Sequence, residues 1–350
     1  MTPLQALLAR RINATGPMTL ADYMADCLMH PTYGYYATRD PFGAGGDFVT
    51  APEISQMFGE LIGLCLAQCW RDQGAPAQIT LAEIGPGRGT LMADLLRATK
   101  GVAGFHTALN VHFIETSPSL RKRQAEAVPG ATWHDDVSTL PEAPLYLVAN
   151  EFFDALPIRQ FSRDAEGWRE HMVGVQGDTL VLGLSAPAPI ALLDDRLADT
   201  KPGDIVEHCP ALRGIVQTIS TKIGAHGGAA LIIDYGDWHS QGDTLQAVQN
   251  HSPANPFANP GLADLTAHVD FEAIAKAAHA FTRVTQQGVF LERLGFTARA
   301  QALAKGLTGD ALEAHIGAHR RLTHPDEMGS LFKVIGLYPP QGAPPPGLDP

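Results

Sequence analysis

The sequence predicts an α/β fold in which helices cover both faces of a parallel sheet. Beyond residue 78, short apolar runs alternate with stretches that have the composition of helices, as expected of repeated strand–helix units. The apolar runs are nearly continuous, which is typical of strands buried on both faces. The chain has 350 residues, 45% of them hydrophobic, so it can bury a sizeable core as one elaborated domain.

The alternation can be followed element by element. The predicted strands are residues 79–84, 109–115, 131–134, 144–149 and 229–235, with closing strands at 283–286 and 331–337. Helices are predicted at 90–98, 118–127 and 211–225. Most consecutive strands are thus separated by a helix, as a parallel sheet requires.

Two segments interrupt the alternation. Residues 159–184 switch between polar and apolar side chains around Gly167 and the Gly177-Asp178 pair, which predicts inserted antiparallel hairpins. Residues 290–328 have the composition of an added helical piece. We therefore expect an N-terminal helical and glycine-rich segment that covers the site (1–60), a core domain (61–338) with insertions at about 158–204 and 290–328, and a disordered proline-rich tail (339–350).

Composition narrows the range of partners. Thirty-seven acidic against 25 basic residues give a net charge of -12, which repels phosphate backbones and excludes nucleic acid as an expected partner. An acidic surface suits a basic segment of a partner protein instead. The four cysteines lack the spacing of a disulfide framework, and no apolar run reaches the length of a membrane span. Without a secretory signal, these features predict a reducing compartment, the cytoplasm.

A glycine-rich turn follows the first predicted core strand. Gly85, Pro86, Gly87 and Gly89 lie between that strand and a predicted helix. Glycines there let the chain turn sharply and bring backbone N–H groups of the helix N-terminus against a ligand. The turn therefore predicts a cofactor site, although nicotinamide enzymes share this feature.

Two residues distinguish the candidate cofactors. The dinucleotide fingerprint has a glycine three residues after Gly87, where this chain has Thr90. Glu83 stands two residues before the first glycine, where a carboxylate would repel a pyrophosphate and suit the cationic amino acid part of S-adenosylmethionine. Both residues favour S-adenosylmethionine, with Glu83 and Thr90 among its expected contacts.

Carboxylates also end the next two strands. Glu115 ends the second strand, where a carboxylate can accept both ribose hydroxyls. Asp136, with Val137 beside it, follows the third strand and is expected at the adenine edge; the alternative is that Asp135 and Asp136 form a surface acidic pair. Because the carboxyl ends of parallel strands meet at one edge, Glu83, Glu115 and Asp136 are expected to converge on one crevice.

The segment after the fourth strand is the candidate for chemistry. Methyl transfer is an in-line displacement, so an enzyme mainly has to orient the acceptor beside the methyl group. Carboxylates can grip a guanidinium bidentately and hold one nitrogen on the line of attack. Glu151 and Asp154 are the predicted catalytic pair, with Asn150 at the cofactor. The alternative is that Glu151 only binds cofactor and Asp154 caps the following turn.

Histidines are weaker candidates. His268 precedes a helix whose predicted capping residue is Asp270, and it is suited to line the acceptor site or act as a base; a structural histidine is the alternative. His315 and His319 have helical i,i+4 spacing, but no neighbouring glutamate completes a metal-binding pattern. We therefore predict no metal.

Several blocks of the chain match one family, in order and along nearly the whole length. The matching blocks are residues 34–36, 46–60, 83–91, 115 with 117–118 and 120–121, 150–157, 233–236, 264–271 and 328–334. The block at 46–60 is specific to this family. With these blocks the chain resembles the mitochondrial complex I assembly-factor arginine methyltransferases and their bacterial relatives, a branch of the class I S-adenosylmethionine-dependent methyltransferases.

The resemblance implies a seven-stranded Rossmann-like fold with N-terminal and inserted elements around the substrate cleft. It implies that the glycine motif and Glu115 bind the cofactor. It also implies that Asp47, Thr50 and Pro52 close over the cofactor; the alternative is that these three residues belong to a purely structural loop. It also implies that mitochondrial members dimethylate an arginine of a respiratory complex I subunit during assembly. The absence of a transit peptide favours a bacterial member.

The expected function is S-adenosylmethionine-dependent protein arginine N-methylation of a partner protein such as a complex I subunit. One alternative is a non-catalytic assembly chaperone that keeps the fold for cofactor binding. A nicotinamide-dependent oxidoreductase is another alternative. The inserted hairpins at 159–184 offer an interface for a homodimer.

Overall fold

The core of the structure is a mostly parallel sheet. The computed structural model describes residues 1–38 and 49–350. The strands follow the order β15-β16-β10-β5-β2-β3-β4, and β14 pairs beside β10. Strands β4, β3, β2, β5 and β10 are parallel, whereas β16 runs antiparallel between β10 and β15. The bounds are β2 (Ile79–Ile84), β3 (Leu109–Ile114), β4 (Thr132–His134), β5 (Leu145–Asn150), β10 (Gly228–Asp237), β14 (Val269–Asp270), β15 (Thr285–Gln286) and β16 (Phe332–Leu337).

Helices cover both faces of this sheet. On β2, Ile79 and Leu81 face one hydrophobic core, and Ala82 and Ile84 face the other, as the alternation of a strand requires. Helices α5 and α6 fill the first core, and α9 and α10 fill the second. The predicted α/β class is thereby confirmed: seven strands form the continuous order, and β14 adds an eighth beside β10. These helices are α5 (Gln56–Asp72), α6 (Thr90–Thr99), α7 (Phe105–Ala108), α8 (Pro118–Ala127), α9 (Leu212–His226) and α10 (Phe271–Ala277).

The strand order reverses next to β2. From β2 the chain continues to β3 and β4 on one side, and it then returns to β5 on the other side. Such a switch point opens a crevice at the carboxyl ends of β2 and β5, because the loops that leave the two strands diverge. The loop after β2 is the glycine turn, and the loop after β5 carries Glu151 and Asp154. The topology therefore brings two predicted site segments to one place.

A second sheet contains the inserted hairpins. Strands β6 (Arg159–Asp164), β7 (Gly167–Gln176) and β8 (Thr179–Leu184) pair antiparallel in sequence order, as predicted. The sheet also includes β9 (Ile205–His208), which lies just past the expected limit of the insertion and pairs with β6. The insertion therefore forms a sheet of its own beside the core.

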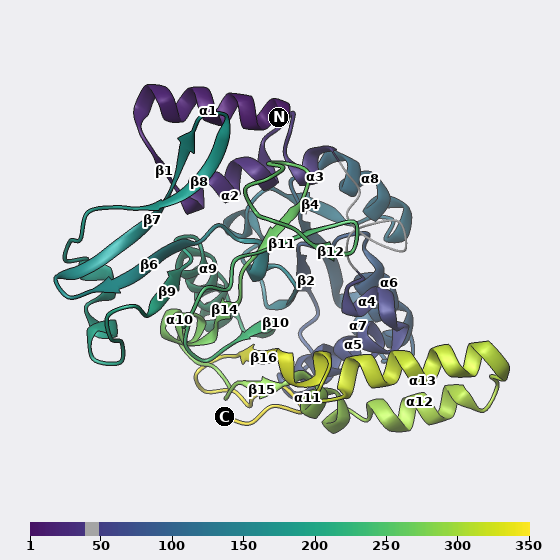
Figure 1. Cartoon of the computed structure of the whole chain (residues 1–350). Coiled ribbons are helices and arrows are strands. Elements are labelled where there is room, and N and C mark those ends of the chain that lie inside the picture. The colour runs from purple at the N-terminus through teal and green to yellow at the C-terminus, as the bar shows by residue number, and fades with distance from the viewer. Residues whose placement is uncertain (39–48) are drawn as a thin grey trace.

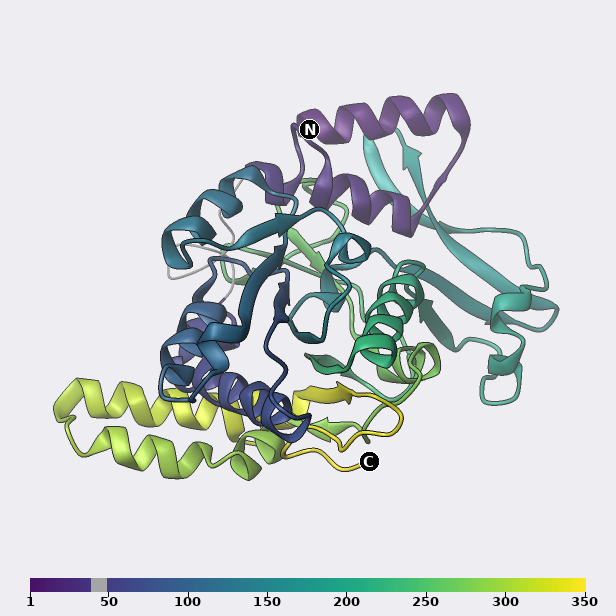
Figure 2. The same cartoon turned by 180° about the vertical axis from the view of Figure 1, so that it is seen from behind.

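The N-terminal helices are built onto this second sheet. Thr2 and Gln5 form a capping box at the start of α1 (Pro3–Thr15), and the Gln5 amide donates to the Asp178 carbonyl at 3.0 Å. Strand β1 (Met18–Thr19) pairs with β7, and α2 (Leu20–Met29) follows it directly. These helices lie at the opposite end of the molecule from the C-terminus (Figure 1, Figure 2).

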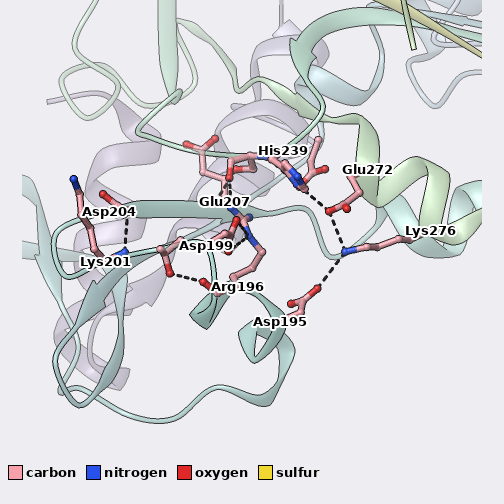
Figure 3. Close-up of polar contacts among 12 residues, drawn as sticks. Asp195, Arg196, Asp199, Lys201, Asp204, Glu207, His239, Glu272 and Lys276 are labelled. Atoms are coloured by element: carbon pink, nitrogen blue, oxygen red, sulfur yellow. Dashed lines mark hydrogen bonds and ion pairs between the residues drawn. The ribbon is translucent and has the colours of Figure 1, made fainter. Parts of the chain in front are cut away.

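Polar contacts tie the insertion to the core (Figure 3). Arg196, which follows the hairpins, donates to the Ser240 carbonyl at 3.0 Å. Lys276 of α10 lies between Asp195 and Glu272, with N–O distances of 3.2 and 2.9 Å. Exposed ion pairs of this kind contribute only about 0–1 kcal/mol each, so they orient the insertion against α10 more than they stabilise it.

The predicted helical insertion lies between β15 and β16. Its members are α11 (Gln287–Arg293), α12 (Phe296–Ala304), α13 (Gly309–Thr323) and α14 (Met328–Leu331). Helices α12 and α13 run side by side along the lower edge of the molecule in Figure 1. Within the described ranges, no helix is long and apolar enough to cross a membrane.

A small third sheet lies between β10 and α10, where the sequence analysis predicts no strand. It consists of β11 (Gln246–Gln249), β12 (Ser252–Pro253) and β13 (Asp264–Thr266). The remaining short elements are helices α3 (Tyr35–Thr38) and α4 (Ala51–Ile54) and the 3-10 turns η1 (Val137–Thr139), η2 (Phe153–Ala155), η3 (Ala191–Leu193) and η4 (Asp195–Leu197).

The expected disorder of residues 339–350 is wrong. Leu348 is 6% exposed and belongs to the core that α5 and α6 fill. The Arg283 N–H donates to the Asp349 carbonyl at 2.9 Å, and the Cys65 thiol contacts the Pro346 carbonyl at 3.5 Å. One buried leucine thus anchors a segment whose prolines already restrict it, and composition alone does not reveal such an anchor.

Replacing Gly228 by Ala should destabilise the junction of β5 and β10. Gly228 has φ +114°, and an added Cβ would lie 1.9 Å from the Leu145 carbonyl oxygen, a backbone atom that cannot swing away. We expect the free energy of unfolding, measured by urea denaturation, to fall by about 3 kcal/mol. The control is Gly214→Ala in α9, where nothing lies within 4 Å of the added atom, and it should raise stability by about 0.5–1 kcal/mol. Equal stability of G228A and the wild type would contradict this crowding.

Candidate functional site

The glycine turn after β2 has a conformation that favours glycine. Gly85 has φ +65°, and a Cβ there would lie 2.9 Å from the ring of Phe152. Gly89, with φ +81°, is the N-cap of α6, and its N–H donates to the Pro86 carbonyl at 2.7 Å. The turn thus lets the loop after β5 approach closely. Because α6 starts without a side-chain cap, its first backbone N–H groups are left for a ligand.

Glu83 lies buried under this turn with an unsatisfied oxygen. Its side chain is 3% exposed, and its Oε2 has no hydrogen-bond partner among the residues that the structure describes. Burial raises the pKa of Glu83 well above its usual value, although the Met92 N–H stabilises the charged form. Because a buried carboxylate oxygen without a partner is costly, this position fits a cationic group such as the ammonium of S-adenosylmethionine.

Glu115 is held just after β3 by two donors. Its carboxylate accepts from the Ser117 N–H at 2.7 Å and from the Gln124 amide at 3.2 Å. The same amide of Gln124 donates to the Gly87 carbonyl at 2.8 Å, so it joins this loop to the glycine turn. Gln124 lies in the polar helix α8, and no sequence motif marks it. The contacts present Glu115 at the crevice edge, where a ribose-binding acid is needed.

Asp136 and Val137 follow β4. Asp136 is exposed, accepts from the Ser138 N–H at 2.7 Å and caps the turn η1. Hydrogen bonds from Ser138 lower the pKa of Asp136. Val137 is buried, and Asp135 is exposed. Capping explains the position of Asp136, and its role at the adenine stays a prediction.

Glu151 is covered by the N-terminal segment. Its Oε1 accepts from the Asn150 amide and from the Ala51 N–H, each at 3.0 Å. Its φ of +51° is a conformation that costs about 1–3 kcal/mol for a residue with a side chain. Burial, together with repulsion from Asp154, raises the pKa of Glu151 to about 7. Strain and a perturbed pKa at one residue are typical of functional sites.

Helix α4 supplies this cover. Thr50 is its N-cap, and Pro52 lies in its first turn. The Thr90 hydroxyl donates to Glu53 at 2.5 Å, so the side chain of Thr90 lies against α4. The start of α4 thus bridges the glycine turn and Glu151. The predicted cofactor residue Asp47 lies outside the described residues.

Asp154 is the second carboxylate of the loop after β5. It is 6% exposed, and its Oδ2 accepts from the Tyr235 hydroxyl at 2.6 Å. Its buried Oδ1 has no partner within residues 1–38 and 49–350. Burial raises the pKa of Asp154 to about 6 in spite of the Tyr235 bond. The loop therefore presents one bound and one unsatisfied oxygen at the crevice.

Asp234 holds this loop in place from β10. It is fully buried, and its Oδ2 accepts the N–H groups of Phe152, Phe153 and Asp154 at 3.2, 3.0 and 3.2 Å. Its Oδ1 accepts the Tyr235 N–H at 2.9 Å. Burial raises the pKa of Asp234, and the charge of Asp154 raises it further. No motif in the sequence assigns Asp234 a role, although an aspartate inside an apolar predicted strand is a usable signal.

His268 lies beside Tyr235, and within residues 1–38 and 49–350 it forms no hydrogen bond or ion pair with Glu151 or Asp154. The two rings are T-shaped with centroids 5.5 Å apart, and the His268 N–H donates to the Thr244 hydroxyl at 2.8 Å. Burial lowers the pKa of His268, so its ring is neutral at pH 7. Its role as a base stays a prediction. Asp270 caps α10 as predicted.

The helical pair His315 and His319 bonds within the helical insertion. The His315 Nε2 lies 3.0 Å from the Ala300 carbonyl, and the His319 Nε2 lies 2.8 Å from the Thr297 hydroxyl. In the described part of the chain, no three His, Cys, Asp or Glu side chains gather where they could hold a metal.

The crevice gathers carboxylates from several strand ends. They are Glu83 near the end of β2, Glu115 directly after β3, Glu151 and Asp154 after β5, and Asp234 in β10. A site of this charge takes cationic ligands. The sheet has helices on both faces, a glycine turn that can bind a nucleoside, and acids that can bind a cation attached to that nucleoside. Together these features define the class of S-adenosylmethionine-dependent methyltransferases.

Comparison with known proteins leads to the same class. Residues 61–289 match the family described as "Putative S-adenosyl-L-methionine-dependent methyltransferase". The chain is 36% identical to the mitochondrial protein arginine methyltransferase NDUFAF7 of Xenopus laevis, over 94% of this chain and 83% of that one. Its identity to the Homo sapiens NDUFAF7 is 34%, over 97% of this chain and 84% of that one. The chain therefore belongs to the NDUFAF7 family of methyltransferases.

A solved structure shares the whole fold. It is a protein from Burkholderia thailandensis, crystallised with S-adenosyl-homocysteine. The TM-score is 0.82 at 30% identity, over 99% of this chain and 92% of that one. The predicted fold class, and S-adenosylmethionine as the cofactor, are confirmed, and the nicotinamide alternative is set aside.

The predicted cytoplasmic location is wrong. The relatives are named mitochondrial proteins. The prediction was drawn from cysteine spacing and from missing signals, and neither is a positive mark of a compartment.

Glu151→Gln should stabilise the ligand-free protein at alkaline pH. The folded-state pKa of Glu151 is about 7 against a usual 4.5, so the folded chain binds this proton more tightly than the unfolded chain. Stability is therefore lost as pH rises from about 4.5 to about 7, by about 3 kcal/mol in all. Gln carries no such charge. We expect the Tm of E151Q to exceed that of the wild type at pH 8 and the two to converge near pH 4.5.

Glu166→Gln, at an exposed hairpin turn, is the matched control and should leave Tm unchanged at both pH values. An E151Q protein less stable than the wild type at pH 8 would show that burial does not destabilise the Glu151 carboxylate.

Proposed function

We propose that this chain methylates an arginine side chain of a partner protein. The observation that carries the proposal is the pair Glu151 and Asp154, a half-buried and a buried acid on one loop, with pKa values of about 7 and 6. An oxygen of Asp154 lacks a partner among the described residues, and a guanidinium offers donors in a planar fork that fits carboxylates. The name of the relatives, protein arginine methyltransferase, supports the same acceptor.

We assign cofactor binding to the crevice beside this pair. S-adenosylmethionine, when bound, supplies a methyl group on a sulfonium. Glu83 would accept from its ammonium through the unsatisfied Oε2, and Glu115 would accept from its ribose hydroxyls. The other proposed cofactor contacts come from the turn and the surrounding loops: Asp47, Thr50, Pro52, Gly85, Pro86, Gly87, Gly89, Thr90, Asp136, Val137 and Asn150.

The two acids serve orientation and proton transfer. Methylation of a guanidinium nitrogen adds a carbon and releases one proton. Groups with pKa values near the working pH accept such a proton most effectively, and Asp154 and Glu151 meet that condition. His268, in ring contact with the Tyr235 that bonds Asp154, is the candidate that passes the proton on.

A non-catalytic assembly chaperone would need the cofactor crevice but not these acids. Asp154 is buried with one oxygen that lacks a hydrogen bond among the described residues, and Glu151 has a left-handed backbone conformation. Both features cost stability, and neither improves packing. Such costs are typical of a site kept for chemistry, which favours an enzyme.

For the partner, we propose a subunit of respiratory complex I that is modified during assembly, as the family resemblance implies. The net charge of -12 suits a basic segment of that subunit. We also propose a homodimer contact on the inserted sheet, because β8 lies at its edge with Leu182 38% and Leu184 54% exposed. Sedimentation of the purified chain as a monomer would contradict this contact.

Glu151→Gln should abolish methylation and keep the cofactor site. Gln retains the size of Glu and an oxygen for the Ala51 and Asn150 donors, but it loses the charge that orients a guanidinium and accepts its proton. We expect turnover to fall by about 100-fold or more. Dimethylarginine on complex I subunits is measured by mass spectrometry in cells that lack the gene and carry either version. Calorimetry with S-adenosylmethionine measures cofactor affinity, which should change little.

Cells that carry E166Q are the matched control and should regain all dimethylarginine. Full activity of E151Q would remove Glu151 from the acceptor site. Identical dimethylarginine in all proteins with and without the gene would remove arginine as the acceptor.

A further inference from the structure

Tyr235 connects the end of β10 to the side chain of Asp154. Its hydroxyl donates to the Asp154 Oδ2 at 2.6 Å, a distance typical of a hydrogen bond to an ionised oxygen. Asp234, the preceding residue of β10, accepts the backbone N–H groups of Phe152, Phe153 and Asp154. Two consecutive residues of one strand thus hold the backbone and the side chain of the same loop.

The ring of Tyr235 is held from two sides. It meets the ring of His268 edge to face, with centroids 5.5 Å apart, and the ring of Phe332 in the same way, with centroids 5.4 Å apart. Phe332 is also the residue that pairs with Tyr235 between β10 and β16. The hydroxyl therefore has a fixed position relative to the sheet. A phenylalanine at 235 could make both ring contacts, so packing alone does not require the hydroxyl.

The hydroxyl of Tyr235 remains a donor at neutral pH. Burial, and then the charges of Asp154 and Asp234, raise the pKa of Tyr235 well above its usual value. For Asp154, burial favours the neutral acid, and the hydrogen bond from Tyr235 is the largest effect that favours the charged form. The ionisation of Asp154 near neutral pH therefore depends on this one hydroxyl.

The neighbouring carboxylates disfavour a charge on Asp154. Asp154 raises the pKa of both Glu151 and Asp234, and repulsion between charges is mutual. The other titratable groups on the elements around Asp154 are Tyr36 of α3, which donates to Asp264; His268, whose ring is neutral at pH 7; and Lys333 of β16, whose ammonium donates to the carbonyls of Gly236, Ser330 and Leu331. Without the Tyr235 hydroxyl, Asp154 would take up a proton near neutral pH.

We propose that Tyr235 is a positioning residue of the acceptor site: its hydroxyl occupies the Oδ2 of Asp154, keeps this carboxylate charged and leaves the Oδ1 for the acceptor. The Oδ1 is buried and has no hydrogen-bond partner among the described residues. The inference rests on the proposed arginine acceptor. A carboxylate binds a guanidinium more strongly than a neutral acid does, and only the carboxylate can accept the proton that methylation releases. Tyr235 thus sets the lower pH limit of acceptor binding.

The first test follows the Asp154 carboxyl group by 13C NMR of the full chain labelled at aspartate, with Asp154→Asn to assign its signal. We expect a pKa of about 6 in the wild type. Tyr235→Phe should raise the pKa of Asp154 to about 7 or above, because a hydrogen bond to the charged form is lost. In the matched control Tyr23→Phe, the lost hydroxyl donates to the Pro256 carbonyl, also at 2.6 Å, and the pKa of Asp154 should not change. An unchanged pKa in Tyr235→Phe overturns the proposal.

The second test distinguishes positioning from a purely structural role. N-acetyl-arginine methylamide is titrated at pH 6.5 and at pH 9 into the full chain saturated with S-adenosyl-homocysteine. Tyr235→Phe should weaken binding by about threefold or more at pH 6.5, where its Asp154 is protonated, and by little at pH 9. Tyr23→Phe should bind as the wild type does at both pH values. Equal weakening in Tyr235→Phe at both pH values, together with a lower Tm, would show a structural role and overturn the proposal.

The two tests separate this inference from the proposed function. A wild type that does not bind the arginine probe, with a raised Asp154 pKa in Tyr235→Phe, overturns the arginine acceptor and supports the action of Tyr235 on Asp154. Arginine binding by the wild type with an unchanged Asp154 pKa in Tyr235→Phe overturns the inference alone.

If Tyr235→Phe does not fold, 3-fluorotyrosine introduced at position 235 decides. The fluorine makes the hydroxyl a stronger donor at nearly the same size, so the pKa of Asp154 should fall below its wild-type value. An unchanged or higher pKa of Asp154 in that protein overturns the proposal.

Discussion

The loop after β5 depends on one carboxylate inside the sheet. Asp234 accepts three consecutive N–H groups, from Phe152 to Asp154, with a single oxygen. Left unpaired in the interior, each of these groups would cost about 1–3 kcal/mol, so the loop follows the position of Asp234. That position is fixed by β10, which pairs with β5 on one side and β16 on the other. Because this loop is bonded to the sheet, it can keep the backbone of Glu151 in its strained conformation.

The same interaction explains why the site is so acidic. Asp234 must be buried to hold the loop, and its charge adds to those of Asp154 and Glu151, which share its surroundings. Arg321 of α13 acts on Glu151 from a distance and offsets only part of this repulsion. Cations therefore stabilise this cluster, and both the sulfonium of the cofactor and the guanidinium of the proposed acceptor are cations. One electrostatic feature would thus serve both ligands.

The predictable parts of the molecule are those encoded by neighbours in sequence. Apolar runs mark the strands, and the rule that parallel strands end at one edge places Glu83 and Glu115 together. Residues whose partners are distant in the sequence cannot be predicted in this way. Asp234 bonds a loop about eighty positions away, and Tyr36 bonds Asp264 at a separation of 228 residues. The ordered tail cannot be predicted in this way either, because its anchor is one leucine that meets the core only after folding.

In the proposed site, the core supplies most of the cofactor residues, with Thr50 and Pro52 added from the N-terminal segment, whereas the acceptor side depends more on the additions to the core. Glu83, the glycine turn and Glu115 all belong to β2, β3 and the segments that directly follow them. On the other side, the N-terminal segment reaches Glu151 through Ala51, and the segment that ends the small sheet reaches Asp154 through the Ala267 N–H. The inserted sheet reaches the same region because Glu207 of β9 accepts the Thr244 N–H at 2.9 Å, and the Thr244 hydroxyl accepts the His268 N–H.

This division has a physical consequence for specificity. Most of the proposed cofactor contacts lie at the end of β2 or in the loops that directly follow the parallel strands, so the sheet fixes their positions. On the proposed acceptor side, the added segments are joined to the core loop by single hydrogen bonds, which can be altered one at a time. For the proposed acceptor, the choice would therefore be set by these additions to the core.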